Sequence, residues 1–275
     1  GVLASSGKYI QFIDSDDFIE RNMIFKMVNS MSIDVELVLC GYKTLCLENG
    51  RKKEVLTVPA ILGIYEIEYI LNNFSILYEK WLINPLWNKL YKAEIIKNNH
   101  IFFDSNLQLG EDLIFNLEYL KKCNKVHIIN DVLYNYITIE MGSLTRSYKE
   151  NMLLSQIKSY KAIYELLNVT KSYNKQNQQT LETMFFSTIV DCFENVVNTN
   201  NKLSVYDKIK NIRIIIENDS VIKNISNVTF KNNILKNEII KILIKNKCTY
   251  CILFLFSIIG SIRKTVKLLL ILINK

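Results

Sequence analysis

The stretch Tyr9–Asp17, YIQFIDSDD, places three acidic residues directly behind a nearly all-apolar run. Tyr9–Ile13 is typical of a short strand that is buried on both faces, as in a parallel sheet. In an extended chain Asp14 and Asp16 point the same way, because side chains alternate between the two faces of a strand. Their carboxylates repel each other, and a hard cation such as Mg²⁺ or Mn²⁺ relieves that repulsion. The stretch therefore predicts a ligand site at the carboxyl end of a buried strand.

A purely structural role for the same acidic residues stays open. Asp16 or Asp17 could cap the N-terminus of the helix that we predict over residues 19–31. A side-chain oxygen at such a position accepts a hydrogen bond from the first turn of the helix. The local sequence favours neither role over the other.

Strands and helices are predicted to alternate up to about residue 148, and every periodic segment after Lys149 is helical. The first helix should bury Ile24, Met27, Val28 and Met31. The further predicted elements are a strand over 35–42, mixed strand and loop over 45–60, a helix over 64–74, an extended segment over 87–91, helices from Ala93 and over 110–120, and strands over 126–129 and 132–137 joined by a turn at Asn130-Asp131. This order predicts an α/β domain over residues 1–148 and a helical region over 149–275.

Glu111 and Asp112 form a second acidic pair, at the start of the predicted helix over 110–120. Acidic residues in a first turn complement the helix dipole, which is a sufficient structural explanation. A carboxylate at the edge of a cleft can instead act as a general base, provided that it is ionised near neutral pH. Both roles stay open on this pair alone.

Several segments taken together resemble the family 2 glycosyltransferases of bacterial surface-polysaccharide synthesis, in motif, order and spacing. The segments are GVLASSGKYIQFIDSDDFI (1–19), WNKLYKAEII (87–96), GEDLIFNLEYL (110–120), YNY (134–136) and GSLT (142–145). The resemblance covers about residues 1–148. It implies a GT-A fold, in which a nucleotide-binding α/β half is followed by an acceptor-binding half.

The resemblance also implies roles for the acidic residues. Asp14-Ser-Asp16 would be the D-x-D motif, with Asp16 the first and Asp14 the second ligand of a Mn²⁺ or Mg²⁺ ion. Asp14 would lie toward the donor, and Asp17 would assist donor binding. Asp112 would be the catalytic base with Glu111 as its neighbour. The implied reaction inverts the sugar: an acceptor hydroxyl loses its proton to Asp112 and attacks the anomeric carbon of a nucleotide-diphosphate sugar.

Other segments of the resemblance indicate contacts with the acceptor and the donor. Trp87, Asn88 and Lys89 are candidate acceptor-binding residues, although for Trp87 a place in the core is favoured over a platform for a sugar ring. Ser143 and Thr145 lie where such enzymes often have a loop that closes over the donor diphosphate. Complete family members also have a strand–helix–strand–helix region ahead of the counterpart of Gly1. The resemblance therefore implies an N-terminally truncated and inactive fragment.

The composition limits the partners and the compartment. The chain has 275 residues, a net charge of +7 and six scattered cysteines, with no secretory signal. This indicates a reducing, cytoplasmic location, and no arginine-rich stripe indicates nucleic acid. The uncharged run Tyr250–Ile262 is shorter than the ~20 residues that span a membrane. It predicts either a core helix or an in-plane helix on the anionic inner face of the membrane, suited to a saccharide or lipid-linked acceptor.

Two further functions compete with sugar transfer. A phosphatase of the haloacid-dehalogenase type also has a D-x-D motif after an apolar strand, but it needs Thr or Val where this chain has Phe18. The other alternative is a non-catalytic helical membrane-surface module in which both acidic clusters only cap helices.

Overall fold

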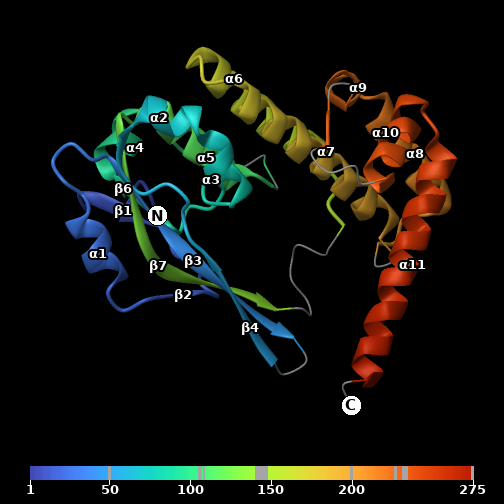
Figure 1. The fold of residues 1–275 in the computed structure, drawn as a ribbon, viewed down its shortest axis with the longest axis horizontal. Helices are drawn as coiled ribbons and strands as arrows, with labels where there is room; N and C mark the ends of the chain where they lie inside the picture. The colour runs from blue at the N-terminus through green and yellow to red at the C-terminus, as the bar shows by residue number, and fades with distance from the viewer. Residues whose placement is uncertain are drawn as a thin grey trace. The chain divides into compact units, whose positions relative to one another are not determined.

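The computed structural model describes residues 1–48, 51–104, 107, 109–139, 148–198, 201–225, 228–230 and 235–273. The strands are β1 (Tyr9–Gln11), β2 (Phe18–Ile19), β3 (Leu37–Glu48), β4 (Arg51–Thr57), β5 (Gly63–Glu66), β6 (Lys89–Lys92) and β7 (Lys125–Ile139). The helices are α1 (Met23–Asn29), α2 (Ile67–Asn72), α3 (Phe74–Glu79), α4 (Ala93–Asn98), α5 (Glu111–Leu120), α6 (Met152–Val169), α7 (Lys175–Val197), α8 (Val205–Glu217), α9 (Asp219–Ile225), α10 (Leu235–Lys245) and α11 (Thr249–Ile273). The predicted α/β fold followed by a helical region is confirmed (Figure 1).

The described strands form one mixed sheet with the order β1-β6-β3-β7-β2, in which β4 also pairs with β3 and β5 with β7. Only the central pair, β3 with β7, is parallel in this part of the chain. The predicted strand at Tyr9–Ile13 is present as β1, but its expected parallel, doubly buried setting is wrong. β1 ends the strand order, pairs antiparallel with β6, and buries only Ile10 fully.

β7 is one continuous strand where the sequence predicts two. Leu39 of β3 lies opposite Ile128, and Gly41 lies opposite Val132, so three residues of β7 face a single residue of β3. The predicted turn at Asn130-Asp131 is therefore a β-bulge, which keeps the strand intact and locally increases its twist.

The helix predicted over 19–31 is shorter, because Phe18–Ile19 pair with β7 as β2. Its buried stripe is also displaced by one position. Met23, Met27 and Met31 are buried, whereas Ile24 and Val28 are exposed. A spacing of four residues keeps Met23 and Met27 on one face of α1, and Met31 follows after the helix ends.

The segment predicted as a helix over 64–74 begins as β5 and continues as α2 and α3. Other predictions hold: the strand at 35–42 is the first part of β3, and α4 begins at Ala93. α5 buries its leucine face as expected, with Leu113, Leu117 and Leu120. In Figure 1 the helices α2 to α5 gather on one side of the sheet, apart from α1.

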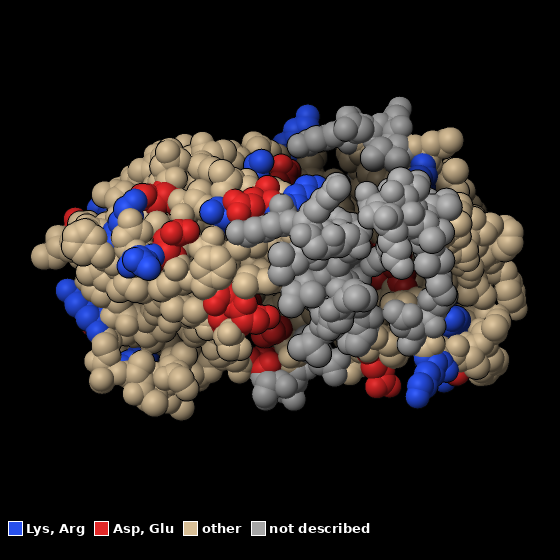
Figure 2. Space-filling view, turned by 90° about the horizontal axis from the view of Figure 1, so that it is seen from below, with Lys and Arg blue, Asp and Glu red and all other residues tan. Residues whose placement is uncertain are grey.

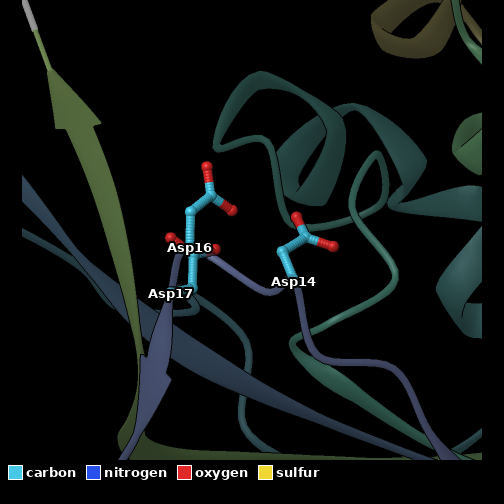
Figure 3. Close-up of side chains that lie close together, drawn as sticks. All are labelled: Asp14, Asp16 and Asp17. Atoms are coloured by element: carbon cyan, nitrogen blue, oxygen red, sulfur yellow. The ribbon is translucent and has the colours of Figure 1, made fainter.

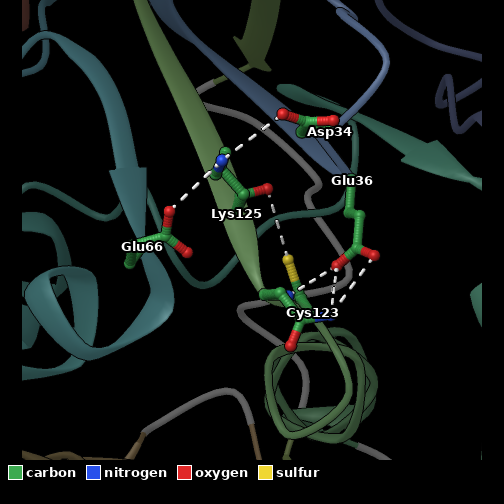
Figure 4. Close-up of polar contacts among 6 residues, drawn as sticks. Asp34, Glu36, Glu66, Cys123 and Lys125 are labelled. Carbon is green, nitrogen blue, oxygen red and sulfur yellow. Dashed lines mark hydrogen bonds and ion pairs between the residues drawn. The ribbon is translucent and has the colours of Figure 1, made fainter.

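A polar cluster joins the starts of β3 and β7 to the end of β5 (Figure 4). The ammonium of Lys125 lies 3.2 Å from a carboxylate oxygen of Glu66 and 3.6 Å from one of Asp34. The carboxylate of Glu36 accepts hydrogen bonds from the backbone and side chain of Asn124. Partly exposed ion pairs contribute little to the free energy of unfolding. The main effect of the cluster is therefore to favour the pairing of these particular strand ends.

By its internal contacts the chain divides into two units. One consists of residues 1–142 and 161–177, and the other of residues 143–160 and 178–275. α6 and α7 each contribute residues to both units. The domain division at residue 148 stays a prediction.

Gly41 gives a test of the close packing beside the bulge. A Cβ atom at Gly41 would lie 2.6 Å from the Thr57 carbonyl oxygen and 3.2 Å from Val132 Cγ2. We expect Gly41→Ala to lower the free energy of unfolding by about 1–3 kcal/mol, since backbone must move to admit the methyl group. Gly260→Ala on α11 is the control, because its new methyl would meet nothing within 4 Å. Chemical denaturation measures both, and an unchanged stability in Gly41→Ala would contradict the packing.

Candidate active site

The acidic turn, Asp14–Asp17, links β1 to β2. It is closed by the backbone N–H of Asp17, which donates to the carbonyl oxygen of Asp14 at 3.2 Å. One carboxylate oxygen from each of Asp14, Asp16 and Asp17 lies within 4.8 Å of the others. Figure 3 shows the Asp14 and Asp16 side chains reaching toward the same side. The carboxylates converge from a tight turn, whereas the sequence predicts an extended chain at Asp14 and Asp16.

The acidic turn is fastened to β7 through Asp17. One oxygen of the Asp17 carboxylate accepts the Tyr134 hydroxyl at 2.8 Å, and the other accepts the Ile137 backbone N–H at 2.7 Å. The Tyr134 oxygen also accepts the backbone N–H of Asp14 at 3.1 Å. Both ends of the turn therefore depend on the same tyrosine.

The charges of the turn have no cationic partner among the described residues. Partial burial and then repulsion by Asp17 and Asp16 raise the pKa of Asp14. Burial also raises the pKa of Asp17, against the lowering effect of its two hydrogen bonds. In the described part of the chain, no hydrogen bond reaches the carboxylate of Asp14 or Asp16. Figure 2 shows acidic side chains gathered near the middle of the face that it draws.

This donor set fits a hard divalent cation. It offers carboxylate oxygens from three side chains, and two of them are exposed and free of other partners in the described residues. Mg²⁺ and Mn²⁺ take oxygen ligands of this kind. The residues that could hold the ion are Asp14 and Asp16, since Asp17 already serves β7.

Asp112 lies in the first turn of α5. The pKa of its carboxyl is raised to about 6, chiefly by burial and then by the charges of Glu111 and Asp14, against the lowering effect of Lys89. The influence of Asp14 brings the two acidic clusters of the sequence into one electrostatic group. Burial gives Asp112 the proton affinity of a useful base near neutral pH.

Glu111 does not act as a helix cap through its side chain. The N-cap is Gly110, with φ of 81°, and no side chain caps this helix end. Among the described residues, Oε2 of Glu111 is buried and has no hydrogen-bond partner. The dipole explanation still applies to both acidic residues, but it leaves this buried oxygen unexplained.

Trp87, Asn88 and Lys89 all lie beneath the surface, at 4%, 0% and 1% exposure. The Lys89 ammonium donates to the Pro85 carbonyl oxygen and, at 2.8 Å, to Oδ1 of Asn88. Burial lowers the pKa of Lys89 to about 7, while attraction to Asp112 opposes that shift. The predicted contact of these three residues with an acceptor stays a prediction, and their burial favours the alternative of a core tryptophan.

Trp87 is stacked in an aromatic group. Its ring lies parallel to those of Tyr134, at 4.2 Å between centroids, and Tyr136, at 5.6 Å. Tyr42 meets it edge-on at 4.8 Å. Trp87 therefore connects the loop before β6 to the tyrosine that holds the acidic turn.

The sequence predicts no role for Tyr134, because the YNY segment (134–136) is only part of the family resemblance. The two-residue spacing of its tyrosines is the signal that places both on one face of a strand. Ser143 and Thr145, the candidate donor-loop residues, lie outside the described residues.

The sequence of the chain is similar to those of bacterial glycosyltransferases. No family model matches the chain. It is 24% identical over 220 residues to the putative glycosyltransferase EpsH of Bacillus subtilis, covering 78% of this chain and 61% of EpsH. It is 30% identical over 162 residues to the glycosyltransferase GlyA of Streptococcus pneumoniae, covering 56% and 22%. The chain thus spans about three fifths of the length of EpsH and a smaller share of GlyA.

The fold also matches a solved structure. Residues 1–349 of TarS from Staphylococcus aureus, in complex with UDP-GlcNAc, superimpose with a TM-score of 0.57 at 16% identity. The match covers 96% of this chain and 70% of that one. TarS is named as a poly(ribitol-phosphate) beta-N-acetylglucosaminyltransferase, and its sequence is 26% identical to this chain over 142 residues, which are 50% of this chain and 22% of TarS. The chain is therefore similar in sequence to bacterial glycosyltransferases and shares the fold of TarS.

Proposed function

We propose that the protein is an inverting family 2 glycosyltransferase. It would move a sugar from a nucleotide-diphosphate donor to a saccharide or lipid-linked acceptor in cell-surface polysaccharide synthesis. The observation that supports this most is the electrostatic group formed by Asp14 and Asp112, in a fold shared with a protein solved in complex with UDP-GlcNAc. The relatives favour this function over a phosphatase or a non-catalytic module.

In this proposal Asp16 and Asp14 hold a Mn²⁺ or Mg²⁺ ion. A bound divalent cation neutralises the charge that develops on a leaving diphosphate. Asp17 keeps the turn in place through Tyr134 and Ile137 and supports donor binding without needing to be a ligand.

Asp112 is proposed as the base that accepts the proton of the attacking acceptor hydroxyl. Its pKa of about 6 leaves it ionised at neutral pH and still a stronger base than an ordinary aspartate. The buried ammonium of Lys89 favours the ionised carboxylate, and Glu111 opposes it. Trp87, Asn88 and Lys89 would then support the acceptor side from beneath the surface.

The base is tested by Asp112→Asn in the full-length protein. We expect transfer to fall by about 10²–10⁴-fold while donor binding stays unchanged, because an amide cannot accept the proton. Glu118→Gln is the control, since Glu118 lies on the same helix and pairs with Lys121. Initial rates of transfer and donor affinity are measured together, and parental turnover in Asp112→Asn would exclude this role.

The metal ligands are tested by Asp16→Ala and Asp14→Ala. We expect Asp16→Ala to remove Mn²⁺-dependent donor affinity and Asp14→Ala to weaken it, because each change removes an oxygen ligand. Asp34→Ala is the control, as Asp34 pairs with Lys125 in the polar cluster. Calorimetric titration with UDP measures the affinity, with and without Mn²⁺. If the UDP affinity of Asp16→Ala depends on Mn²⁺ as it does in the parental protein, the acidic turn has only a structural role.

We further propose that α11 rests on the anionic inner face of the cell membrane. None of the helices in the described part of the chain has the length and apolar character that a membrane crossing requires. α11 buries Ile252 and Phe256 against its own unit and exposes an apolar stripe on another face. The stripe consists of Tyr250, Phe254, Ile258 and Ile262, which are 67%, 69%, 40% and 57% exposed.

Basic residues occur on both sides of this stripe in the sequence. Lys245 and Lys247 precede it and are exposed, and Arg263, Lys264 and Lys267 follow it. An apolar face flanked by cations is typical of a helix that lies in the plane of an anionic bilayer. The sequence predicts either a core helix or an in-plane surface helix for Tyr250–Ile262. In this proposal α11 is both, with one face in the core of its unit and another on the membrane.

The membrane contact is tested with the double variant Phe254→Ser and Ile258→Ser in the full-length protein. We expect it to leave anionic vesicles for the supernatant, because it removes apolar area without changing charge. Phe25→Ser with Ile33→Ser is the matched control, since both residues are exposed outside this helix. Co-sedimentation with phosphatidylglycerol vesicles is measured. Equal sedimentation of the two double variants would contradict the proposal.

A further inference from the structure

The hydroxyl of Tyr134 makes two hydrogen bonds to the acidic turn, one at each end. It accepts the backbone N–H of Asp14 at 3.1 Å and donates to the Asp17 carboxylate at 2.8 Å. The side chain is fully buried at 0% exposure, so it cannot touch a substrate directly. Any effect of Tyr134 on the site must act through the turn.

The ring of Tyr134 has little freedom to move. It stacks on Trp87 with an interplanar angle of 11°. Trp87 is itself held by Tyr42 and by the buried loop before β6. Stacked rings of this kind add to the stability that burial gives. The hydroxyl is therefore presented to the turn from a fixed position.

The turn needs such a support because its three carboxylates repel one another. Of these three carboxylates, only that of Asp17 accepts hydrogen bonds within the described residues, from Tyr134 and Ile137. Without the hydroxyl, the Asp14 N–H loses its acceptor and one Asp17 oxygen loses its donor. Repulsion would then move Asp14 and Asp16 apart.

We propose that Tyr134 is a positioning residue, which sets the spacing of the Asp14 and Asp16 carboxylates for a divalent cation. This inference rests on the proposed function of the turn as a metal site. Outer partners of metal ligands typically change metal affinity by about 10–100-fold when they are removed. We expect a loss of that size in Tyr134→Phe, which keeps the ring and removes only the hydroxyl.

The experiment is a Mn²⁺ titration of the full-length protein in the presence of UDP, followed by electron paramagnetic resonance of free Mn²⁺. It reports binding without turnover. Tyr42→Phe is the matched control: its ring also touches Trp87, and its hydroxyl donates to the Lys80 carbonyl oxygen at 3.4 Å. Thermal unfolding of every variant separates a loss of metal affinity from a loss of fold.

Asp17→Asn removes the charged end of the same hydrogen bond and serves if Tyr134→Phe does not fold. In the double variant with Tyr134→Phe, the two losses of affinity should not add, because both break one contact. Folded variants with parental Mn²⁺ affinity, or a Tyr42→Phe variant as weak as Tyr134→Phe, would overturn the inference alone. Absence of Mn²⁺ binding in the parental protein would overturn the proposed metal site as well.

Discussion

The register of β7 against β3 is the constraint on which the candidate site depends. β7 holds the acidic turn through Tyr134 and Ile137 and also pairs with β2 and β5. Because side chains alternate along a strand, a slip of one residue would turn the tyrosine to the opposite face of the sheet. The register shifts once opposite Cys40 and again between Gly41 and Tyr42, where β7 has one extra residue and the phase changes. The close packing of Gly41 leaves the two strands little room to shift.

The site combines like charges that a folded chain would normally keep apart. The charge of Asp14 raises the pKa of Asp112, and the charges of Asp17 and Asp16 raise the pKa of Asp14. The compensation visible in the described residues comes from neutral hydrogen bonds to Asp17 and from Lys89 beside Asp112. An arrangement in which part of the repulsion is left uncompensated is typical of sites that bind a cation or transfer a proton.

Local patterns in the sequence predicted the elements that depend on local forces. The helix that begins at Glu111 and the helical region after Lys149 follow from apolar spacing, and both are present. The two acidic clusters were also found, because charge behind an apolar strand is a visible pattern. Asn130-Asp131 was predicted as a turn from its residue types, yet pairing with β3 keeps β7 continuous. The role of Tyr134 depends on that non-local pairing, so no local pattern could reveal it.

The division of α6 and α7 between two contact units has a consequence for how this chain can be taken apart. The polypeptide passes from one unit to the other at 142/143, 160/161 and 177/178. A single cleavage at residue 148 would leave 161–177 of the first unit on the C-terminal piece. Exchange of the helical region with that of a relative would therefore need junctions inside α6 and α7. A junction placed in a loop would leave part of one unit on the wrong side of it. Because of this interleaving, no single junction in the chain separates the two units.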